Sequence, residues 1–331
     1  MAAATMRAVR YSAKGPPSVM QLEDIPTPKP LTGEVLVRVE FAGVNPVDAK
    51  IRSSNGLLIL PLPATPGKDC SGYVAEVGPD VTSVKVGDRV VVADRVFRSG
   101  GTYASYHVAK EEEVILLPDG YSLEEGASIG APYLTAIRAI YHSVRGKAGE
   151  TIFIHGASGQ VGIAAVQLGV AHGFTVYGTA GTDEGLKRVL DNGAKAVFNH
   201  RKDGYLDEVK KVIGPNGPHI IIELVASTNF QHDLDLAPRR GRIAVIGGNG
   251  QPLSVNPAAI MAKELVVTGV MVTGSTPEEW KEMTSIFREG LAKRWIRPVI
   301  QKIYPLSDVV QAHTDIEASA DGAQGRLVLK I

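Results

Sequence analysis

Residues 151–173 read TIFIHGASGQVGIAAVQLGVAHG, and the architecture of much of the chain follows from this stretch. A β-rich run leads into Gly156, Gly159 and Gly162, after which apolar residues recur at helical spacing. One glycine permits the tight turn, one lets the backbone approach a pyrophosphate, and the third lets helix and strand pack closely. The N-terminus of the following helix favours a bound phosphate. The stretch therefore predicts a dinucleotide-binding loop rather than a purely structural one.

Strand-like and helical patterns alternate after this loop. The runs FTVYGT, AVFNH, HIIIELV, GRIAVIG and ELVVTGVMV are strand-like, and GLKRVLDNGA and LDEVKKVIG between them are helical. This order predicts a parallel sheet with helices on both faces. After Pro277 a helical pattern leads to short strand-like pieces that end in GRLVLKI. Because a few short strands cannot form a core of their own, we expect these pieces to return to the first domain.

The first third of the chain has a β pattern. The runs EVLVRVEFAGV, SGYVAEVG, DRVVVAD and YASYHVA are alternating or β-rich, with Gly and Pro between them. A helix is expected after Pro118, where Ser122 and Glu125 have the spacing of a capping box. We therefore predict an α/β protein with two domains. Residues 126–270 form a Rossmann domain with a doubly wound parallel sheet, and residues 1–125, completed by 271–331, form a mainly β domain.

Composition indicates an ordinary globular protein. The chain has 331 residues, 44% hydrophobic and 21% charged, enough for two cores. Lys plus Arg equals Asp plus Glu at 35 each, so no net charge attracts nucleic acid or anionic lipid. No apolar run approaches the ~20 residues that span a bilayer. The start, MAAATMRAVR, lacks the apolar core of a signal peptide, which favours a cytoplasmic protein.

The single cysteine, Cys70, excludes an intrachain disulfide and a four-cysteine zinc cluster. A lone thiol can be a nucleophile. In PGKDCSGYV, however, it comes where a strand begins, and a small buried thiol is the commoner outcome there. We therefore expect a structural role for Cys70.

Tyr106 and Lys110 have the Tyr-x-x-x-Lys spacing of short-chain dehydrogenases. In those enzymes the pair lies on a helix after the nucleotide loop. Here the pair precedes the loop in a β-rich region, where side chains four residues apart are far from each other. We interpret this spacing as a coincidence.

The end of the second strand predicts which dinucleotide binds. An NAD site usually carries an acidic residue about 20 residues after the loop, to hold the ribose 2′-hydroxyl. Here the strand ends in residues 178–181, GTAG, without an acid. Lys187 follows on the next helix, and His200 and Arg201 close the next strand, which leaves room and positive charge for the 2′-phosphate of NADPH. The alternative is that Lys187 and Arg201 are solvated surface charges.

The order of a β-rich domain, a glycine loop near residue 156 and a short C-terminal return resembles the medium-chain dehydrogenases/reductases. Within them the chain is similar to zinc-free quinone oxidoreductases of the zeta-crystallin type. The stretches that carry this resemblance are GVNPVDAKIRS, LPATPGKDCSG, VGDRV, GAPYLTAIRAI, HGASGQVG, GTAGTDEG, FNHR, AKE and RPVI. The resemblance implies a GroES-like catalytic first domain, NADPH as the cofactor, a quinone substrate and a homodimer or homotetramer. The apolar run ELVVTGVMV is the edge strand expected to pair.

The same resemblance implies that the chain has no metal site. In the alcohol-dehydrogenase branch, the positions that match Asn45, Lys68–Asp69 and Ala131 carry the Cys, His–Glu and Cys of the catalytic metal centre. The residues present here do not make a closed zinc set. Hydride transfer is therefore expected to proceed without a Lewis acid.

Cofactor contacts follow from the resemblance by position. They are Lys50, Ser158, Gly159, Gln160, Val161, Gly181, Lys187, His200, Asn229, Ile246, Gly247, Gly248 and Asn249. The role of Lys50 is open, because related proteins often have Tyr there. Asn229 is also predicted from the sequence, since it follows a strand at the carboxyl edge of the sheet, where ligands bind. The alternative for Asn229 is a cap of the next helix.

A quinone that accepts hydride needs hydrogen-bond donors or water to meet its growing negative charge. The candidates are Asn45, Asp48 and Tyr133, in stretches that the family places around the nicotinamide. Asp48 could instead cap a turn after Pro46, and Tyr133 could belong to the core. The sequence has no evident Ser-His-Asp, Cys-His or paired-carboxylate set, so we expect positioning of the nicotinamide to matter more than a dedicated acid.

Two other functions stay open at this point. An NADPH-dependent reductase of activated double bonds, such as enals or enones, would use the same fold and the same hydride. A cofactor-binding protein with a structural or RNA-binding use is also suggested by the zeta-crystallin resemblance. The neutral net charge and the lack of a basic cluster speak against RNA as the main partner.

Overall fold

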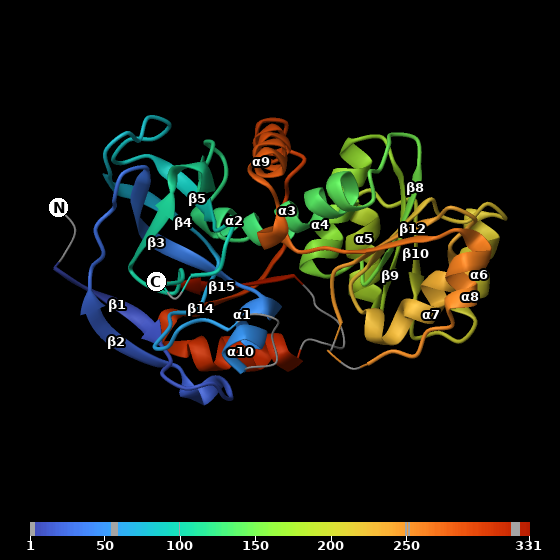
Figure 1. The fold of residues 1–331 in the computed structure, drawn as a ribbon, viewed down its shortest axis with the longest axis horizontal. Helices are drawn as coiled ribbons and strands as arrows, with labels where there is room; N and C mark the ends of the chain where they lie inside the picture. Colours follow the sequence, from blue (N-terminus) through green and yellow to red (C-terminus); the bar gives the residue numbers. More distant parts are fainter. Residues whose placement is uncertain (1–3, 54–58, 99, 249, 251, 319–324) are drawn as a thin grey trace. The chain divides into compact units, whose positions relative to one another are not determined.

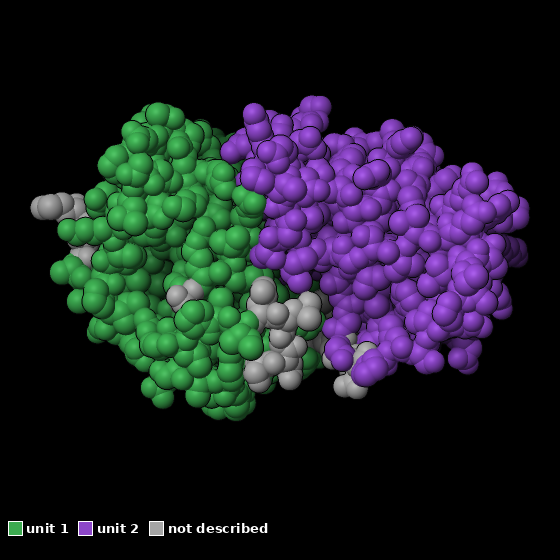
Figure 2. Space-filling model, viewed as in Figure 1, with its two compact units in different colours: residues 1–131, 298–320, 325–331 green, residues 132–297, 321–324 purple. Residues whose placement is uncertain are grey.

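The computed structural model of the chain describes residues 4–53, 59–98, 100–248, 250, 252–318 and 325–331. The chain divides into two compact units (Figure 2). The first unit comprises residues 1–131, 298–320 and 325–331, and the second comprises residues 132–297 and 321–324.

The second unit therefore includes residues 271–297, which the sequence interpretation assigned to the first domain. The helix α9 (Pro277–Ala292) lies in this segment. Arg138, also in the second unit, ties it there through a 2.7 Å ion pair between Arg138 Nη1 and Glu279 Oε2.

The first unit contains two sheets. A seven-stranded sheet has the order β14-β15-β3-β4-β5-β7, with β6 paired to β3, and β1 and β2 form a separate antiparallel pair. The strands are β1 (Thr5–Arg10), β2 (Gln21–Pro26), β3 (Glu34–Val44), β4 (Asp69–Val77), β5 (Arg89–Ala93), β6 (Tyr106–Lys110), β7 (Val114–Leu116), β14 (Ile300–Pro305) and β15 (Arg326–Lys330). Because β15 pairs antiparallel with β3, the end of the chain completes this sheet.

Short helices connect these strands. They are η1 (Pro17–Val19), α1 (Pro46–Ser53), η2 (Glu111–Glu113), α2 (Leu123–Gly126), η5 (Leu306–Asp308) and α10 (Val309–Ala318). Ser122 caps α2 as predicted, since its side chain accepts a hydrogen bond from the Glu125 N–H. Residues Val309, Ala312 and Ile316 of α10 belong to the same buried apolar cluster as the valines of β3.

The second unit has one six-stranded parallel sheet, which confirms the predicted doubly wound domain. Its strands are β8 (Thr151–His155), β9 (Thr175–Ala180), β10 (Ala196–Asn199), β11 (Ile220–Glu223), β12 (Arg242–Val245) and β13 (Val266–Gly269). Their order is β10-β9-β8-β11-β12-β13. The chain thus runs outward from β8 on one side and from β11 on the other, so the strand order reverses between these two neighbours. Ligands of such sheets bind at this point, outside the carboxyl ends of the strands.

Helices cover both faces of this sheet (Figure 1). The helices of the unit are α3 (Gly130–Ile137), whose first two residues belong to the first unit, the π-helix η3 (Arg138–Ser143), α4 (Gln160–Ala171), α5 (Asp183–Asp191), α6 (Tyr205–Ile213), α7 (Ala226–Leu236), α8 (Pro257–Lys263), η4 (Val272–Gly274) and α9. Phe153, Tyr177 and Ile221 pack in one buried cluster with apolar residues of α6, α7 and α8. Bulky apolar side chains at alternate strand positions therefore hold α6, α7 and α8 to the sheet.

The structure agrees with two further sequence interpretations. Cys70 is free and fully buried in β4, and burial raises the pKa of its thiol well above the usual value, so it is not poised as a nucleophile. Tyr106 and Lys110 lie at the two ends of the strand β6 and not on a helix. Among the described residues, no helix is both long enough and apolar enough to cross a membrane.

Candidate cofactor and substrate site

The glycine loop joins β8 to α4 at the carboxyl edge of the parallel sheet. Gly156 has φ +72°, a left-handed conformation that a side chain would strain. Its N–H donates to Thr179 Oγ1 over 3.0 Å, and the Ala157 N–H donates to the Thr179 carbonyl over 2.8 Å. Thr179 therefore fixes the start of the loop to the neighbouring strand β9.

The end of the loop leaves the first turn of α4 open. Gly159 is the N-cap residue of α4 and offers no side chain to satisfy the first N–H groups of the helix. A Cβ on Gly162 would lie 2.6 Å from the carbonyl oxygens of both Gly156 and Ala157. The loop thus folds back on its helix as closely as glycine allows. The Gly159 N–H itself donates to the Gly156 carbonyl over 3.1 Å. The contacts of Ser158, Gly159, Gln160 and Val161 with a pyrophosphate stay a prediction from the sequence.

The side chains of His200 and Arg201 lie together just after the end of β9. A Cβ on Gly181 would lie 2.7 Å from His200 Nε2 and 2.9 Å from Arg201 Nε, so both side chains pack against this glycine. Burial, followed by the charge of Arg201, lowers the pKa of His200. Near neutral pH the positive charge at this point is therefore that of Arg201, and the neutral imidazole of His200 can contribute a hydrogen bond.

Lys187 lies in a different environment. It is on α5 with 76% of its side chain exposed, and its Nζ is 2.6 Å from Asp191 Oδ2, one helical turn away. Such an exposed pair contributes little to stability, so the ammonium group can exchange Asp191 for another anion.

The loops after β11 and β12 also lie at the carboxyl edge of the parallel sheet. The Ala226 N–H donates to the Gly247 carbonyl over 2.9 Å, and a Cβ on Gly247 would lie 2.2 Å from the Leu224 carbonyl oxygen. Asn229 is half-buried inside α7, whose N-cap is Val225, so it does not cap that helix. Because β8, β11 and β12 are neighbours, Asn229 and the turn from Ile246 to Gly248 follow strand ends on the same side of the sheet as the glycine loop. Asn249 lies outside the described residues.

In the first unit, Arg326 of β15 occupies the centre of a buried polar cluster. Its Nη2 lies 2.7 and 2.8 Å from the two carboxylate oxygens of Asp69, and its Nη1 donates to Asn45 Oδ1 over 2.6 Å. Asn45 Nδ2 and the Ala131 N–H also donate to Asp69, each over 2.9 Å. Asn45 and Asp69, at two of the positions that match metal ligands of the alcohol-dehydrogenase branch, thus contact a guanidinium group, and Ala131, at a third, donates to Asp69. This arginine was not predicted from the sequence, although it is the charged residue that opens the apolar run RLVL.

Lys68, at the fourth such position, is 5% exposed. Its Nζ donates to the Asp94 carbonyl and lies 4.3 Å from the centre of the Phe97 ring. Burial lowers the pKa of this ammonium group, while the nearby carboxylates oppose the shift. Lys68 is therefore engaged with protein groups.

Asp48, on α1, is 4% exposed and accepts two hydrogen bonds on the same oxygen, Oδ2. The donors are the Asn45 N–H at 3.0 Å and the Tyr103 hydroxyl at 3.1 Å. Burial, followed by the charge of Asp69, raises the pKa of Asp48 to about 7. A proton on this carboxyl belongs on Oδ1, because Oδ2 already accepts two donors. Asp48 is thus poised to exchange a proton near neutral pH. The contact of Tyr103 with Asp48 was not predicted from the sequence.

Two predicted site residues have other surroundings. The Tyr133 hydroxyl donates to Gln167 Oε1 over 2.6 Å and accepts from the Arg297 N–H over 3.1 Å, and its side chain is buried. This hydrogen is therefore not available to a substrate, and the structure favours the core alternative for Tyr133. Lys50 is exposed in the last turn of α1.

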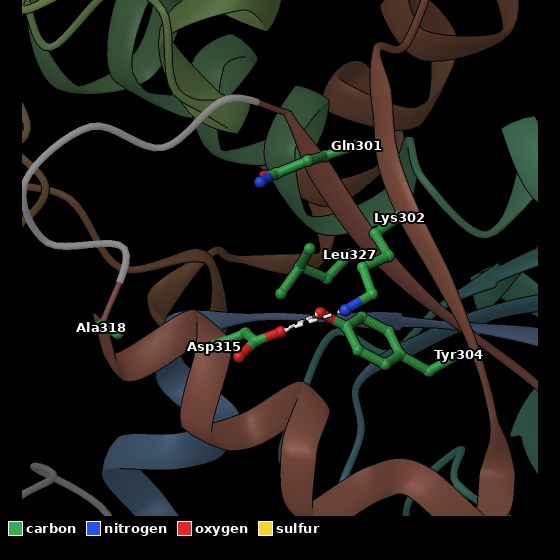
Figure 3. A pocket seen from close by; sticks show the side chains of 6 residues that line it. All are labelled: Gln301, Lys302, Tyr304, Asp315, Ala318 and Leu327. Atoms are coloured by element: carbon green, nitrogen blue, oxygen red, sulfur yellow. Dashed lines mark hydrogen bonds and ion pairs between the residues drawn. The ribbon is translucent and has the colours of Figure 1, made fainter.

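None of the predicted site residues lines the pocket of the first unit that Figure 3 shows. Its lining residues are Gln301, Lys302, Tyr304, Asp315, Ala318 and Leu327. Asp315 accepts hydrogen bonds from the Tyr304 hydroxyl and, over 3.4 Å, from Lys302 Nζ. The polar groups of Tyr304 and Lys302 are thus engaged by Asp315.

Comparisons with known proteins cover nearly the whole chain. Residues 32–119 match the alcohol dehydrogenase GroES-like domain, and residues 161–289 match the family described as zinc-binding dehydrogenase. The quinone oxidoreductase of Sus scrofa is 45% identical over 325 residues, which are 98% of this chain and 97% of the relative. The quinone oxidoreductase of Homo sapiens is 44% identical over the same shares of the two chains.

Solved structures have the same fold. The Escherichia coli quinone oxidoreductase complexed with NADPH superposes with a TM-score of 0.87 at 27% identity, covering 98% of this chain and 100% of that one. An NAD-dependent alcohol dehydrogenase superposes with a TM-score of 0.88, also at 27% identity and with the same coverage. These two structures differ in the cofactor that their names state, so fold alone does not select the cofactor.

Proposed function

Because the chain belongs to the quinone oxidoreductase family of medium-chain dehydrogenases/reductases, we propose that it transfers hydride from NADPH to quinones without a metal ion. The observation that carries the cofactor assignment is the end of β9, where His200 and Arg201 pack against Gly181. In an NAD site an acid would stand near this point.

NADPH, when bound, supplies the hydride, and a quinone that accepts it must also gain a proton. In this proposal the glycine loop and the N-terminus of α4 hold the pyrophosphate, and Arg201, His200 and Lys187 hold the 2′-phosphate. Asn229 and the turn from Ile246 hold the nicotinamide end. Asp48 supplies or relays the proton, because its pKa of about 7 lets it exist in both forms at neutral pH. Asn45 keeps that carboxyl in place through its N–H.

Metal independence rests on the residues of the first unit. The guanidinium of Arg326 already neutralises Asp69, and Asn45 is held between these two side chains. A transition metal of a catalytic site prefers thiolate, imidazole and carboxylate ligands, and the one thiol, Cys70, is fully buried and protonated. The name of the matched dehydrogenase family therefore does not transfer its zinc to this chain.

NADPH consumption against a panel of quinones and enones, together with NADP+ reduction by alcohols, tests the substrate class. We expect turnover with quinones and little or none with alcohols. Faster turnover with enones than with every quinone would instead support the reductase of activated double bonds.

The choice of NADPH over NADH depends on the cations near Gly181. A charge-assisted hydrogen bond is worth roughly 1.5–3 kcal/mol, or on the order of tenfold to a hundredfold in affinity. Lys187→Ala and Arg201→Ala are each expected to weaken NADPH by about that factor and to leave NADH nearly unchanged. The effect of Arg201 should be the larger, because Lys187 is more exposed and shared with Asp191. Fluorescence titration of both cofactors measures this.

The preference for NADPH should also shrink as salt is raised, because these contacts are screened ion pairs. Lys187→Arg keeps the charge and serves as the control. An equal loss of NADH and NADPH affinity in either alanine variant would mean that the residue supports the site without contacting the phosphate.

Proton supply by Asp48 predicts a pH dependence of kcat/KM. The protonated carboxyl is the donor, so kcat/KM for quinone should fall about tenfold per pH unit above the pKa of about 7. The Tyr103 hydroxyl bonds to the ionised carboxylate and lowers its pKa, so Tyr103→Phe should move the fall to higher pH. Asp48→Asn should be slow and lack this fall. A wild-type profile that is flat from about pH 6 to 9 would remove Asp48 from the proton path.

The homodimer or homotetramer is also part of the proposal. In the described residues, β13 is the last strand of its sheet, and Val266 and Val267 are 51% and 37% exposed there. The N–H groups of Val266 and Val270 donate inward, to the carbonyls of Gly241 and Val245. By alternation the Val267 N–H points to the free edge, where a second copy would pair with it.

Val267→Pro removes that outward donor and spares the inward ones, so we expect a smaller particle in light scattering. Val267→Ile keeps the donor and should behave as wild type. A wild-type protein that is already monomeric at micromolar concentration would refute this interface. The cytoplasmic location expected from the sequence stays a prediction.

A further inference from the structure

Three ionisable side chains are buried together beneath the cofactor loops of the second unit. His155 is the last residue of β8, Glu223 is the last residue of β11, and Asp233 lies on α7. All three are 0% exposed. A ring nitrogen of His155 and one carboxylate oxygen from each acid lie within 4.8 Å of one another.

The polar atoms of this cluster lack ordinary partners. His155 Nε2 lies 3.2 Å from Asp233 Oδ1, and Glu223 Oε1 accepts from the Val225 N–H. Among the described residues, Glu223 Oε2, both oxygens of Asp233 and both ring nitrogens of His155 have no hydrogen-bond partner of good geometry. Two ionised carboxylates cannot hydrogen-bond to each other, whereas two carboxyls that hold a proton can. Protons held between these groups would therefore give the buried atoms hydrogen-bond partners.

The charges of the cluster agree with this arrangement. Burial, followed by the charge of Asp233, raises the pKa of Glu223 to about 8. Burial raises the pKa of Asp233 to about 8 as well. Burial also lowers the pKa of His155, so its ring is neutral. The ionisable groups that face the cluster from other elements are Tyr205 on α6 and His200 after β10, with His232 of α7 3.5 Å from the Tyr205 hydroxyl.

The cluster is connected to the segments proposed to hold the dinucleotide, both along the chain and by hydrogen bonds. His155 immediately precedes the first glycine of the pyrophosphate loop. Glu223 accepts the Val225 N–H with its side chain and the Ile246 N–H with its carbonyl, so it fixes the loops after both β11 and β12. Asp233 lies one helical turn beyond Asn229 on α7.

We propose that His155, Glu223 and Asp233 are positioning residues for the cofactor, joined by shared protons that hold the three loops together and keep the cluster uncharged. The inference rests on the proposed use of NADPH at this edge of the sheet. When one of these protons is lost, a buried carboxylate remains and repels the phosphates above it in a medium of low dielectric. Binding of NADPH then requires a proton to be taken up.

A metal ion is the other occupant that these residue types could take, and the geometry favours protons. A closed structural metal site has four protein ligands, whereas this cluster offers three. The residues are fully buried, so water is poorly placed to supply the fourth ligand. Elemental analysis of the purified protein forms part of the test.

The experiment measures the Kd of NADPH between about pH 6 and pH 10 by fluorescence titration. For the wild type we expect a constant Kd below the pKa of about 8 and a Kd that weakens about tenfold per pH unit above it. The double variant Glu223→Gln/Asp233→Asn keeps the shapes and cannot ionise, so its Kd should stay flat. Asp235→Asn, on the exposed face of the same helix, is the matched control and should follow the wild type.

A second measurement keeps the inference separate from folding and from the proposed function. As pH rises from about 4.5 to 8, the melting temperature of the wild type without cofactor should fall relative to that of the double variant, because protons held by the native Glu223 and Asp233 carboxyls are released on unfolding. A wild-type Kd that is flat to high pH, a double variant that follows the wild type, or one metal ion per chain would overturn the inference. Failure of the wild type to bind NADPH at any pH would instead contradict the proposed function.

Discussion

Replacing Gly159 with aspartate is expected to abolish NADPH binding and to leave the fold intact. Gly159 has φ −75° and ψ 174°, a conformation that any residue adopts, and aspartate is a favoured N-cap. The fold should therefore tolerate or even gain from the change. The new carboxylate would take the N–H groups of α4 that are proposed to hold the pyrophosphate. At 4 Å from a phosphate charge it would cost about 4 kcal/mol with an effective dielectric constant near 20.

A loss of this size weakens the Kd roughly a thousandfold, beyond the range of an ordinary titration. Gly159→Asn is the matched control, because it caps the helix with the same shape and no charge. It should bind NADPH more weakly than the wild type and far better than the aspartate variant. Circular dichroism and thermal melting should show that both variants are folded. Tight binding of NADPH by a folded Gly159→Asp protein would place the cofactor somewhere else.

Replacing Arg326 with methionine is expected to cost about 3–5 kcal/mol of unfolding free energy, because it leaves a buried carboxylate without its partner. Asp69 is 0% exposed and receives two of its hydrogen bonds from this guanidinium. Asn45 also loses the donor to its Oδ1, so the backbone that holds Asp48 is loosened. Urea denaturation measures the loss.

Two variants separate the ion pair from packing. Arg326→Lys keeps the charge without the planar fork, so it should recover only part of the stability. Arg326→Met/Asp69→Asn removes the orphaned charge and should be more stable than Arg326→Met alone. A loss below about 1 kcal/mol in Arg326→Met would mean that Asp69 finds solvent or is protonated.

The parts of the fold that could be predicted from the sequence are those with a local pattern. The three glycines, the β-rich run before them and the helical spacing after them are adjacent in sequence, so the loop and its sheet were predictable. The absence of an acid in residues 178–181 was equally visible. His200 next to Gly181 also follows from strand order, because β9 and β10 are parallel neighbours.

The rest depends on contacts between distant segments. Asn45 and Arg326 are 281 residues apart in sequence, and their pairing depends on β15 returning to β3. The Tyr103 hydroxyl reaches Asp48 across 55 residues. The stretch GAPYLTAIRAI predicts Tyr133 as a site residue, yet its hydroxyl is hydrogen-bonded to Gln167 and Arg297. Short-range patterns carry no information about which buried polar groups will meet.

The most direct test of metal-independent hydride transfer from NADPH is a paired measurement on one sample of protein treated with a strong chelator. Metal content is measured by elemental analysis, and NADPH oxidation by a quinone is measured in the continued presence of the chelator. We expect no stoichiometric zinc and undiminished turnover, with NADPH much preferred to NADH. Nearly one zinc per chain before treatment, lost together with the activity and restored by added zinc, would contradict it.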